Sequence, residues 1–337
     1  MGNKRGNRKV NKPNKYRVYK RFGSDIEAAM STKHVEAKFR GHKGWDAIKV
    51  ARMYQSELAS PLNNMIMTAE VNWDKSGNNA IFVQPKDVDA LLKGKYSLNK
   101  LPELFTPYPA FTLCLPSTFE VNGIKPSGVL VSVHPEYESF KACMREMFTL
   151  IGAPIIEPAE QEAGIHNIMT IAYTEPSGAH CAMSYHGEQL TAIFNAKDFK
   201  EYLSLIEDAE MHDVYEAKLT EAENELQYTL IKLIVGLSVF CMAKPTAIHE
   251  GFPKVKLFSL DSPFGNGVKS HSLSTSFSTG NGTRPGEHHR SWFIRQLSHE
   301  KYYQGEHAGK APNSRFAFVD DTLVNSKVNP KHLRTDQ

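Results

Sequence analysis

The sequence predicts an α+β protein: a helical N-terminal portion, a mixed or antiparallel sheet with flanking helices, and a small basic C-terminal module after a Gly/Ser-rich connection. Short apolar runs bounded by proline and turn residues fill the middle of the chain, which is typical of strands. Long amphipathic patterns follow them, which predicts helices. Of the 337 residues, 41% are hydrophobic and 23% charged, so the chain can bury a large core without cross-links.

The first third of the chain is predicted to be mainly helical. Ser24 begins a helical pattern that continues to about Ala59. Residues 75–79, which read Lys-Ser-Gly-Asn-Asn, predict a turn. A short strand over residues 80–83 and a helix beginning at Asp87 are expected to follow.

The middle of the chain predicts the sheet. Residues 111–115 and 128–134 have the apolar, β-branched composition of buried strands. Residues 167–173 and 180–185 are expected to pair as a hairpin, because a Glu-Pro-Ser-Gly turn separates them. Residues 138–150 predict a helix packed on this sheet.

Two further helices are expected after the sheet, over residues 198–206 and 213–242. Residues 198–225 hold ten acidic side chains against two lysines, which favours a solvated helix face. The apolar run 230–243 contains Lys232 and is shorter than the roughly 20 residues that span a membrane. It therefore predicts a buried helix rather than a membrane anchor.

Composition divides the chain into five parts. Residues 1–22 hold nine Lys or Arg and no acid, which predicts a disordered basic arm. An α+β core domain is expected over 23–258 and a flexible connection over 259–289. A basic aromatic module over 290–326 and a tail over 327–337 complete the chain.

The basic arm and the C-terminal module both predict contact with RNA, through phosphates and through stacking on unpaired bases. The alternatives are a solubilising tail for the arm and a place in the core for the tryptophan. The predicted RNA-binding residues are Lys4, Arg5, Arg8, Lys9, Lys12, Arg17, Arg290, Trp292, Arg295, Tyr302, Tyr303 and Arg315.

The C-terminal histidines leave an enzymatic alternative open. A metal-independent ribonuclease would use His299 in acid–base chemistry with Arg295 or Arg315 on the phosphate. No HExxH or CxxC motif occurs, so neither a metal site nor a cofactor is predicted. The four cysteines are expected to be reduced, which favours a cytoplasmic protein.

Three separated patches resemble one family, the large type V-A anti-CRISPR proteins of phages and plasmids and their relatives on other mobile elements. The patches are residues 106–116, residues 230–245 with 251–253, and a C-terminal series made of 294–295, His299, 302–305, 315–318 and 323–325. The chain departs from the family pattern at Gln296–Lys301, which keeps one histidine of a longer run. It also departs at Ala317–Phe318, where the family has a second arginine, and in its basic arm.

The resemblance implies a phage or mobile-element protein that blocks expression of a host defence protein. Such a protein recognises the nascent polypeptide of its target and promotes loss of the mRNA. The implied partners are that polypeptide and RNA or the ribosome, in the bacterial cytoplasm and without a membrane. A peptide is expected to add to the edge of the central strands, at Phe111, Leu113, Val129 and Val131. A toxin-type endoribonuclease and a phage nucleic-acid-binding protein remain alternatives.

Overall fold

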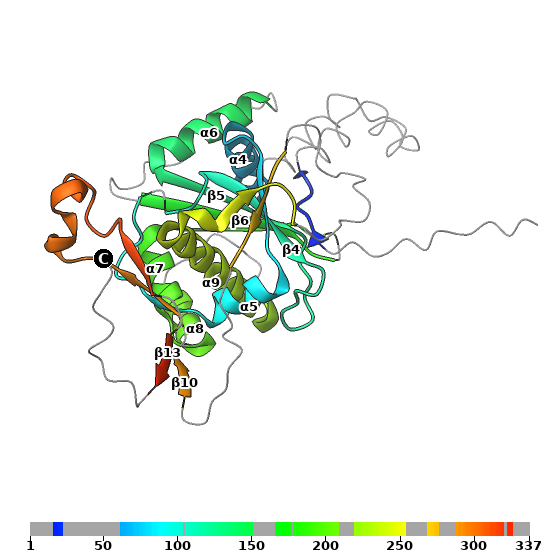
Figure 1. Ribbon diagram of the computed structural model, residues 1–337. Coiled ribbons are helices and arrows are strands. Elements are labelled where there is room, and N and C mark those ends of the chain that lie inside the picture. Colours follow the sequence, from blue (N-terminus) through cyan, green and yellow to red (C-terminus); the bar gives the residue numbers. More distant parts are fainter. Residues whose placement is uncertain are drawn as a thin grey trace, which may run out of the picture.

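The computed structural model confirms the α+β class, with a sheet between two layers of helices (Figure 1). The structure describes residues 16–22, 61–103, 105–150, 166–176, 178, 180–208, 219–253, 268–275, 287–290, 292–319 and 322–325. The helical pattern predicted from Ser24 to Ala59 lies outside these residues, as does the whole of the predicted tail, 327–337. The statements below concern the described residues.

The main sheet is mixed and has eight strands in the order β7-β6-β5-β4-β2-β9-β8, with β1 paired to β4. The strands are β1 (Tyr16–Arg17), β2 (Asn79–Phe82), β4 (Ala110–Pro116), β5 (Val129–Glu136), β6 (His166–Thr174), β7 (His180–Tyr185), β8 (Ile248–Glu250) and β9 (Lys269–Leu273). β4 to β7 form an antiparallel meander, which confirms the predicted β6–β7 hairpin. β2 runs parallel to both β4 and β9.

Helices cover both faces of this sheet. On one face lie α4 (Pro61–Lys75) and α6 (Tyr137–Leu150). On the other face lie α5 (Pro85–Lys93), α7 (Gly187–Asn195), α8 (Phe199–Asp208) and α9 (Glu221–Ala243). α4 and α7 were not predicted from the sequence.

α9 is the central helix of the larger core. Thr220 caps it by accepting a hydrogen bond from the Glu223 backbone N–H, and Glu223 reaches back in a capping box. α9 is long and apolar enough to cross a membrane, but 72% of its most apolar 18-residue stretch is buried inside the protein. It is therefore a core helix, as the short apolar run 230–243 and its Lys232 predicted.

The predicted flexible connection over 259–289 is wrong for residues 268–275, which include β9. This strand is rich in serine, so its composition resembles a loop. Its neighbours hold it in the sheet, because the His271 Nε2 lies 3.0 Å from the Asn79 Oδ1 and the Thr275 hydroxyl donates to the buried Asp87 carboxylate. A second described piece, β10 (Glu287–Arg290), pairs with β13 (Thr322–Asn325).

The predicted disordered arm is wrong for residues 16–22, and residues 1–15 lie outside the described chain. Tyr16, Tyr19 and Phe22 are buried, and the Tyr19 hydroxyl donates to the buried Glu70 carboxylate at 2.9 Å. The segment crosses so close to Gly128 that a Cβ there would lie 2.2 Å from the Tyr19 backbone nitrogen. Aromatic burial therefore outweighs the basic composition of this short segment.

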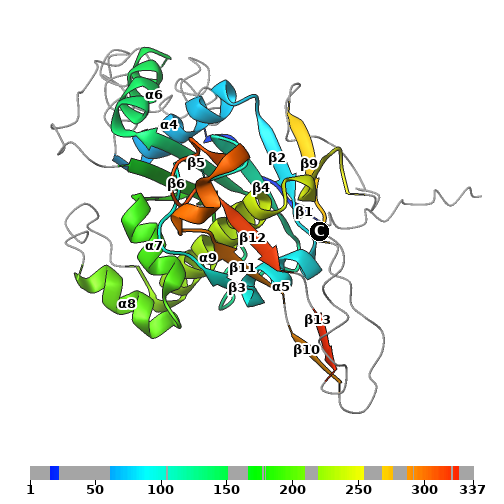
Figure 2. The same cartoon turned by 60° about the vertical axis from the view of Figure 1, so that its left-hand side comes forward.

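A second, three-stranded sheet packs on α9 (Figure 2). It consists of β3 (Lys95–Ser97), β11 (Phe293–Gln296) and β12 (Phe316–Val319), in the order β12-β11-β3. β11 is parallel to β3 and antiparallel to β12. Trp292 and Ile294 belong to the same core cluster as α9, and Phe316 and Phe318 pack against it. The predicted separate module over 290–326 is therefore wrong for β11 and β12.

Candidate functional site

The central strands cannot offer the sheet edge that was predicted for a peptide. Phe111, Leu113, Val129 and Val131 are each 0% exposed. β4 lies between β5 and β2, so its backbone groups are already paired on both sides. The apolar composition of these strands reflects burial on both faces of the sheet.

Two of the predicted RNA-binding residues are structural. Trp292 is 8% exposed, and its ring packs against the rings of Tyr96, Phe240 and Phe318. The Arg17 guanidinium donates to the carbonyls of Pro116 and Phe119, and burial lowers its pKa. Neither group is presented to a nucleic acid.

The remaining predicted RNA-binding residues of the N-terminal arm lie outside the described chain: Lys4, Arg5, Arg8, Lys9 and Lys12. Arg290 ends β10, opposite Thr322 of β13. The prediction of RNA contact at these positions stays a prediction.

The structure places two of the three proposed catalytic residues at one short helix. His299 caps the 3-10 helix η3 (Glu300–Tyr303), since its Nδ1 accepts a hydrogen bond from the Lys301 backbone N–H at 3.2 Å. The Arg315 guanidinium donates to the Tyr302 carbonyl at the other end of the same helix. Among the described residues, no hydrogen bond or ion pair joins His299, Arg295 and Arg315. Two of these three side chains therefore shape the connection between β11 and β12.

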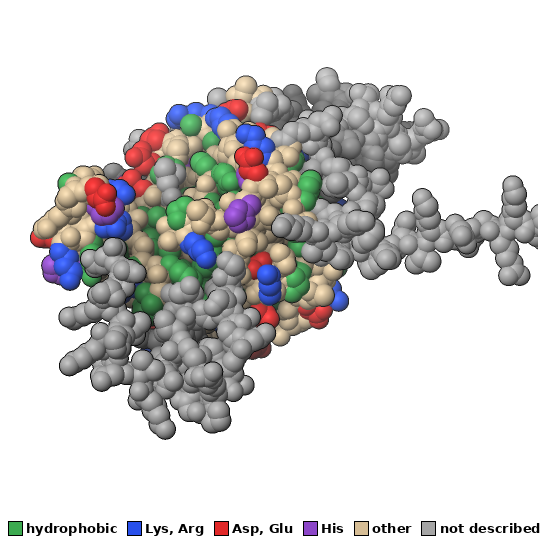
Figure 3. Space-filling model, in the orientation of Figure 1, with side chains coloured by type: hydrophobic (Ala, Val, Ile, Leu, Met, Phe, Trp, Pro, Cys, Tyr) green, Lys and Arg blue, Asp and Glu red, His purple; other side chains and the backbone are tan. Residues whose placement is uncertain are grey.

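That connection projects from the body at the left of Figure 1 and carries both signs of charge (Figure 3). It also contains η4 (Gly305–His307) and is held to the sheet by the Tyr303 hydroxyl, which donates to the Leu297 carbonyl at 2.5 Å. Glu300 and Glu306 offset Lys301 and Lys310, all four of them exposed. The projection is therefore not a concentrated cationic surface for RNA.

The outer face of the small sheet does carry exposed cations. Along β11, Ile294 and Gln296 point into the protein, whereas Arg295 is exposed. Arg295 lies opposite Ala317 of β12 and Ser97 of β3 in the registers of the two pairings. Lys95 is exposed and shares this face of β3 with Ser97, because alternate residues of a strand share a face.

One edge of this sheet has the properties of a peptide-binding strand. β12 is an end strand, and among the described residues it pairs only with β11. All four of its side chains (Phe316, Ala317, Phe318 and Val319) are partly buried. Phe318 stacks on Trp292 at a centroid distance of 5.7 Å, and the Lys244 ammonium lies 5.5 Å from the Phe318 ring centroid. An apolar strand with an open edge can accept another strand.

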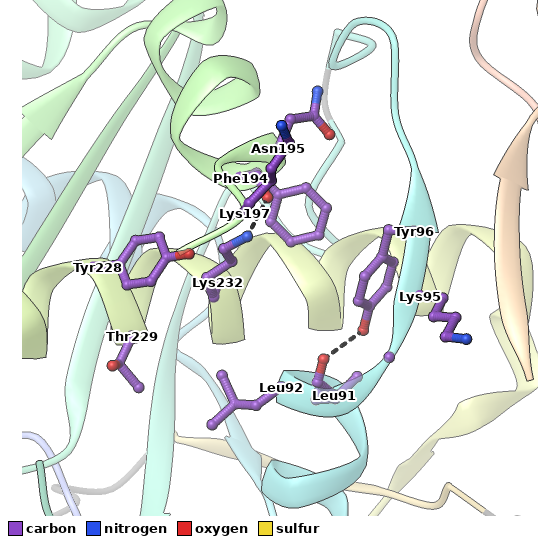
Figure 4. A pocket seen from close by; sticks show the side chains of 11 residues that line it. Leu91, Leu92, Lys95, Tyr96, Phe194, Asn195, Lys197, Tyr228, Thr229 and Lys232 are labelled. Atoms are coloured by element: carbon purple, nitrogen blue, oxygen red, sulfur yellow. Dashed lines mark hydrogen bonds between the residues drawn. The ribbon is translucent and has the colours of Figure 1, made fainter. Parts of the chain in front are cut away.

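A cavity of about 520 Å³ lies where α5 and α7 end, beside α9 and β3 (Figure 4). It is lined by Leu91, Leu92, Gly94, Lys95, Tyr96, Phe194, Asn195, Lys197, Tyr228, Thr229 and Lys232. The lining thus combines three lysines with three aromatic rings and includes no carboxylate. Sequence reasoning noted Lys232 as a lone cation in an apolar helix but did not connect it with a site.

Lys232 is the best-anchored polar group of the cavity. Its ammonium donates to the carbonyls of Phe194 at 2.5 Å and Ala196 at 2.7 Å, just where α7 ends. It also lies 5.4 Å from the Phe194 ring centroid and 5.2 Å from the Tyr228 ring centroid. Burial lowers the pKa of Lys232, and the charge of Glu201 partly opposes that shift. The side chain therefore holds α7 against α9 while facing the cavity.

Within the described chain, no cluster of three or more His, Cys, Asp or Glu has the arrangement of a metal site. The full sequence matches no protein-family model, and no match is found among curated proteins.

Proposed function

We propose that this chain is a binding protein of a phage or other mobile element, one that lowers expression of a host defence protein by recognising its nascent polypeptide and promoting loss of the mRNA. The observation that carries the proposal is the open apolar edge of β12. An extended chain emerging during synthesis can pair with such an edge through its main chain. The cytoplasm of the bacterial host is the compartment that this function requires.

The positions of the resembling segments support the proposal. Residues 230–243 belong to α9. Residues 294–295 lie in β11, and residues 315–318 cover the start of β12 and the residue before it. α9 packs against both strands. The third segment, 106–116, ends in β4 of the main sheet. Two of the three patches thus adjoin the proposed peptide edge.

The departures from the family pattern affect what this edge would recognise. Where the family has a second arginine, this chain has Ala317 and Phe318. Phe318 packs on Trp292, and Ala317 lies opposite Arg295. A peptide on β12 would therefore meet a small apolar surface, with Arg295 beside Ala317 and Lys244 beside Phe318, which favours apolar side chains in the target segment.

RNA contact is proposed for the outer face of the same sheet. Arg295 and Lys95 are exposed on this face, and phosphate contacts of this kind position a complex without reading sequence. A nascent chain and its message are both held by the translating ribosome, so a peptide edge next to a face for phosphate contacts fits the proposed mechanism.

A pull-down from a translating bacterial lysate, with and without ribonuclease treatment, tests the proposal by mass spectrometry and RNA sequencing. The variant is Ala317→Glu, which places a charge on the β12 edge. The matched control is Ala311→Glu, an exposed alanine of the projecting connection that lies outside the three strands of the small sheet. We expect the unmodified protein and Ala311→Glu to recover one message with its own nascent product, and Ala317→Glu to lose both.

Two other results favour the alternatives. Broad RNA recovery that disappears with added salt, equal in all three proteins, indicates a nucleic-acid-binding protein. Degradation of naked RNA that His299→Ala abolishes indicates a ribonuclease.

A further inference from the structure

We propose that the cavity between α5, α7, α9 and β3 binds a small organic anion with an aromatic ring, such as a nucleoside monophosphate or an aromatic carboxylate. This site is independent of the proposed function, which uses the other edge of the small sheet. Its volume of about 520 Å³ lies within the range of small-molecule sites, about 300–1,000 Å³.

The walls of the cavity suit a planar ring. Figure 4 shows the Tyr228 ring on one side of Lys232 and the rings of Phe194 and Tyr96 on the other. Phe194 and Tyr96 already pack edge to face, with centroids 5.0 Å apart. Aromatic rings pair favourably in offset or edge-on arrangements at such spacings. A bound aromatic ring would cover Leu92, one of the few large hydrophobic side chains that are exposed among the described residues.

The charges of the cavity select an anion. Lys197 and Lys232 contribute two ammonium groups, whereas the Lys95 side chain points away from the cavity in Figure 4. None of the lining residues is acidic, although the Glu201 charge acts on Lys232 from outside the lining. Lys197 is exposed, so it is a mobile cation at the rim. Lys232 is partly buried and fixed, so it provides the defined contact. An anion joining it would favour the charged form that burial disfavours.

The helix ends at the cavity oppose an anion less than unpaired helix ends would. The last carbonyls of a helix carry partial negative charge, which normally favours cations. Here the Leu91 carbonyl accepts the Tyr96 hydroxyl at 2.9 Å, and the carbonyls of Phe194 and Ala196 accept the Lys232 ammonium. These acceptors are therefore satisfied. An ammonium has three donors, so Lys232 keeps one for a ligand.

Isothermal titration calorimetry of the full chain tests this site with adenosine monophosphate and salicylate as probes. Adenosine keeps only the ring system and inorganic phosphate keeps only the charge, so the two serve as single-feature controls. We expect one or both aromatic anions to bind, and the single-feature controls to bind at least about tenfold more weakly. Which of the two anions binds better distinguishes a nucleotide site from a carboxylate site.

Lysine variants locate the binding. Lys197→Gln removes an exposed lining cation, whereas the matched control Lys93→Gln removes an exposed cation of α5 that does not line the cavity. We expect about a tenfold loss of affinity in Lys197→Gln and none in Lys93→Gln. Lys232→Met is expected to lose more, and its unfolding midpoint is measured alongside because it also releases the end of α7.

Two results overturn the proposal. One is the absence of binding by both aromatic anions at about 1 mM. The other is equal affinity in the unmodified protein and Lys197→Gln. Neither result bears on the peptide edge at β12, and a failed lysate experiment does not affect the cavity.

Discussion

The two sheets of this protein contain strands of similar composition in opposite situations. In the main sheet, the apolar residues of β4 from Ala110 to Leu115 and of β5 from Val129 to Val133 are at most 1% exposed, and both strands are paired on both edges. In the small sheet, β12 is equally rich in Phe, Ala and Val, but it is an end strand with partly buried side chains. The comparison teaches that apolar β composition reports burial, whereas the availability of an edge depends on which strands lie at the end of a sheet.

The largest expected difference between the sheets is in stability. Phe111→Ala removes a fully buried ring from β4, and we expect the free energy of unfolding to fall by about 3–5 kcal/mol. Phe316→Ala on partly buried β12 is expected to lower it by about 1–2 kcal/mol, because less apolar area is buried there. Urea denaturation of the two variants measures this. Equal losses would contradict the distinction between a core strand and a peptide edge.

The sequence predicted much of the main sheet and little of the site. Strands near 111–115 and 128–134 and the 167–185 hairpin were predictable because buried apolar runs and turn residues are local features. β9 was not, since its composition resembles a loop and its His271 is held by a distant partner, Asn79. The peptide edge was misplaced for the same reason: β3 pairs with β11, and β4 with β2 and β5, through contacts that no local pattern records.

A buried histidine gives the main sheet a pH dependence. His134 is 2% exposed and is hydrogen-bonded to the hydroxyls of Ser132 and Ser139. Burial, aided by the charge of Lys75, lowers its pKa from 6.5 to about 4. The folded state therefore resists protonation, and the stabilisation present above pH 6.5 is lost as the pH falls toward 4.

We expect that loss to be about 3 kcal/mol. The free energies of unfolding of the unmodified protein and of His134→Gln, measured by urea denaturation at pH 7 and pH 4, test it. The difference between the two proteins should be about 3 kcal/mol larger at pH 7. A difference that does not change with pH would contradict a neutral buried imidazole.

Removing one tyrosine hydroxyl next to each sheet is expected to lower the free energy of unfolding by a smaller amount. Tyr19→Phe leaves the buried Glu70 carboxylate without one of its donors, so we expect a loss of about 1–3 kcal/mol. Tyr303→Phe removes the bond to the Leu297 carbonyl at a partly exposed position, with an expected loss of about 0.5–1 kcal/mol. Thermal unfolding compares the two variants. A larger loss in Tyr303→Phe would show that the N-terminal segment contributes little to the fold.

The smallest effect on stability is expected at Arg295, which is exposed on the outer face of the small sheet. Arg295→Gln should change the free energy of unfolding by less than about 0.5 kcal/mol. If it contacts RNA phosphate, the slope of log affinity against log salt should shrink by about 1. RNA filter binding across a salt series measures this slope, with Lys310→Gln on the projecting connection as a control. An unchanged slope removes Arg295 from the RNA surface.

The long-range pairing of the small sheet also sets the order in which the protein can fold. The Gln296 side chain accepts the Asn99 backbone N–H across a sequence separation of 197 residues, in the same region where β3 lies beside β11. At a synthesis rate of about 5–20 residues per second, roughly 10–40 s pass between the appearance of the two strands. Contacts between residues so far apart in the sequence form late, so β3, which contributes to the cavity, gains its partner β11 only late in the protein's own translation.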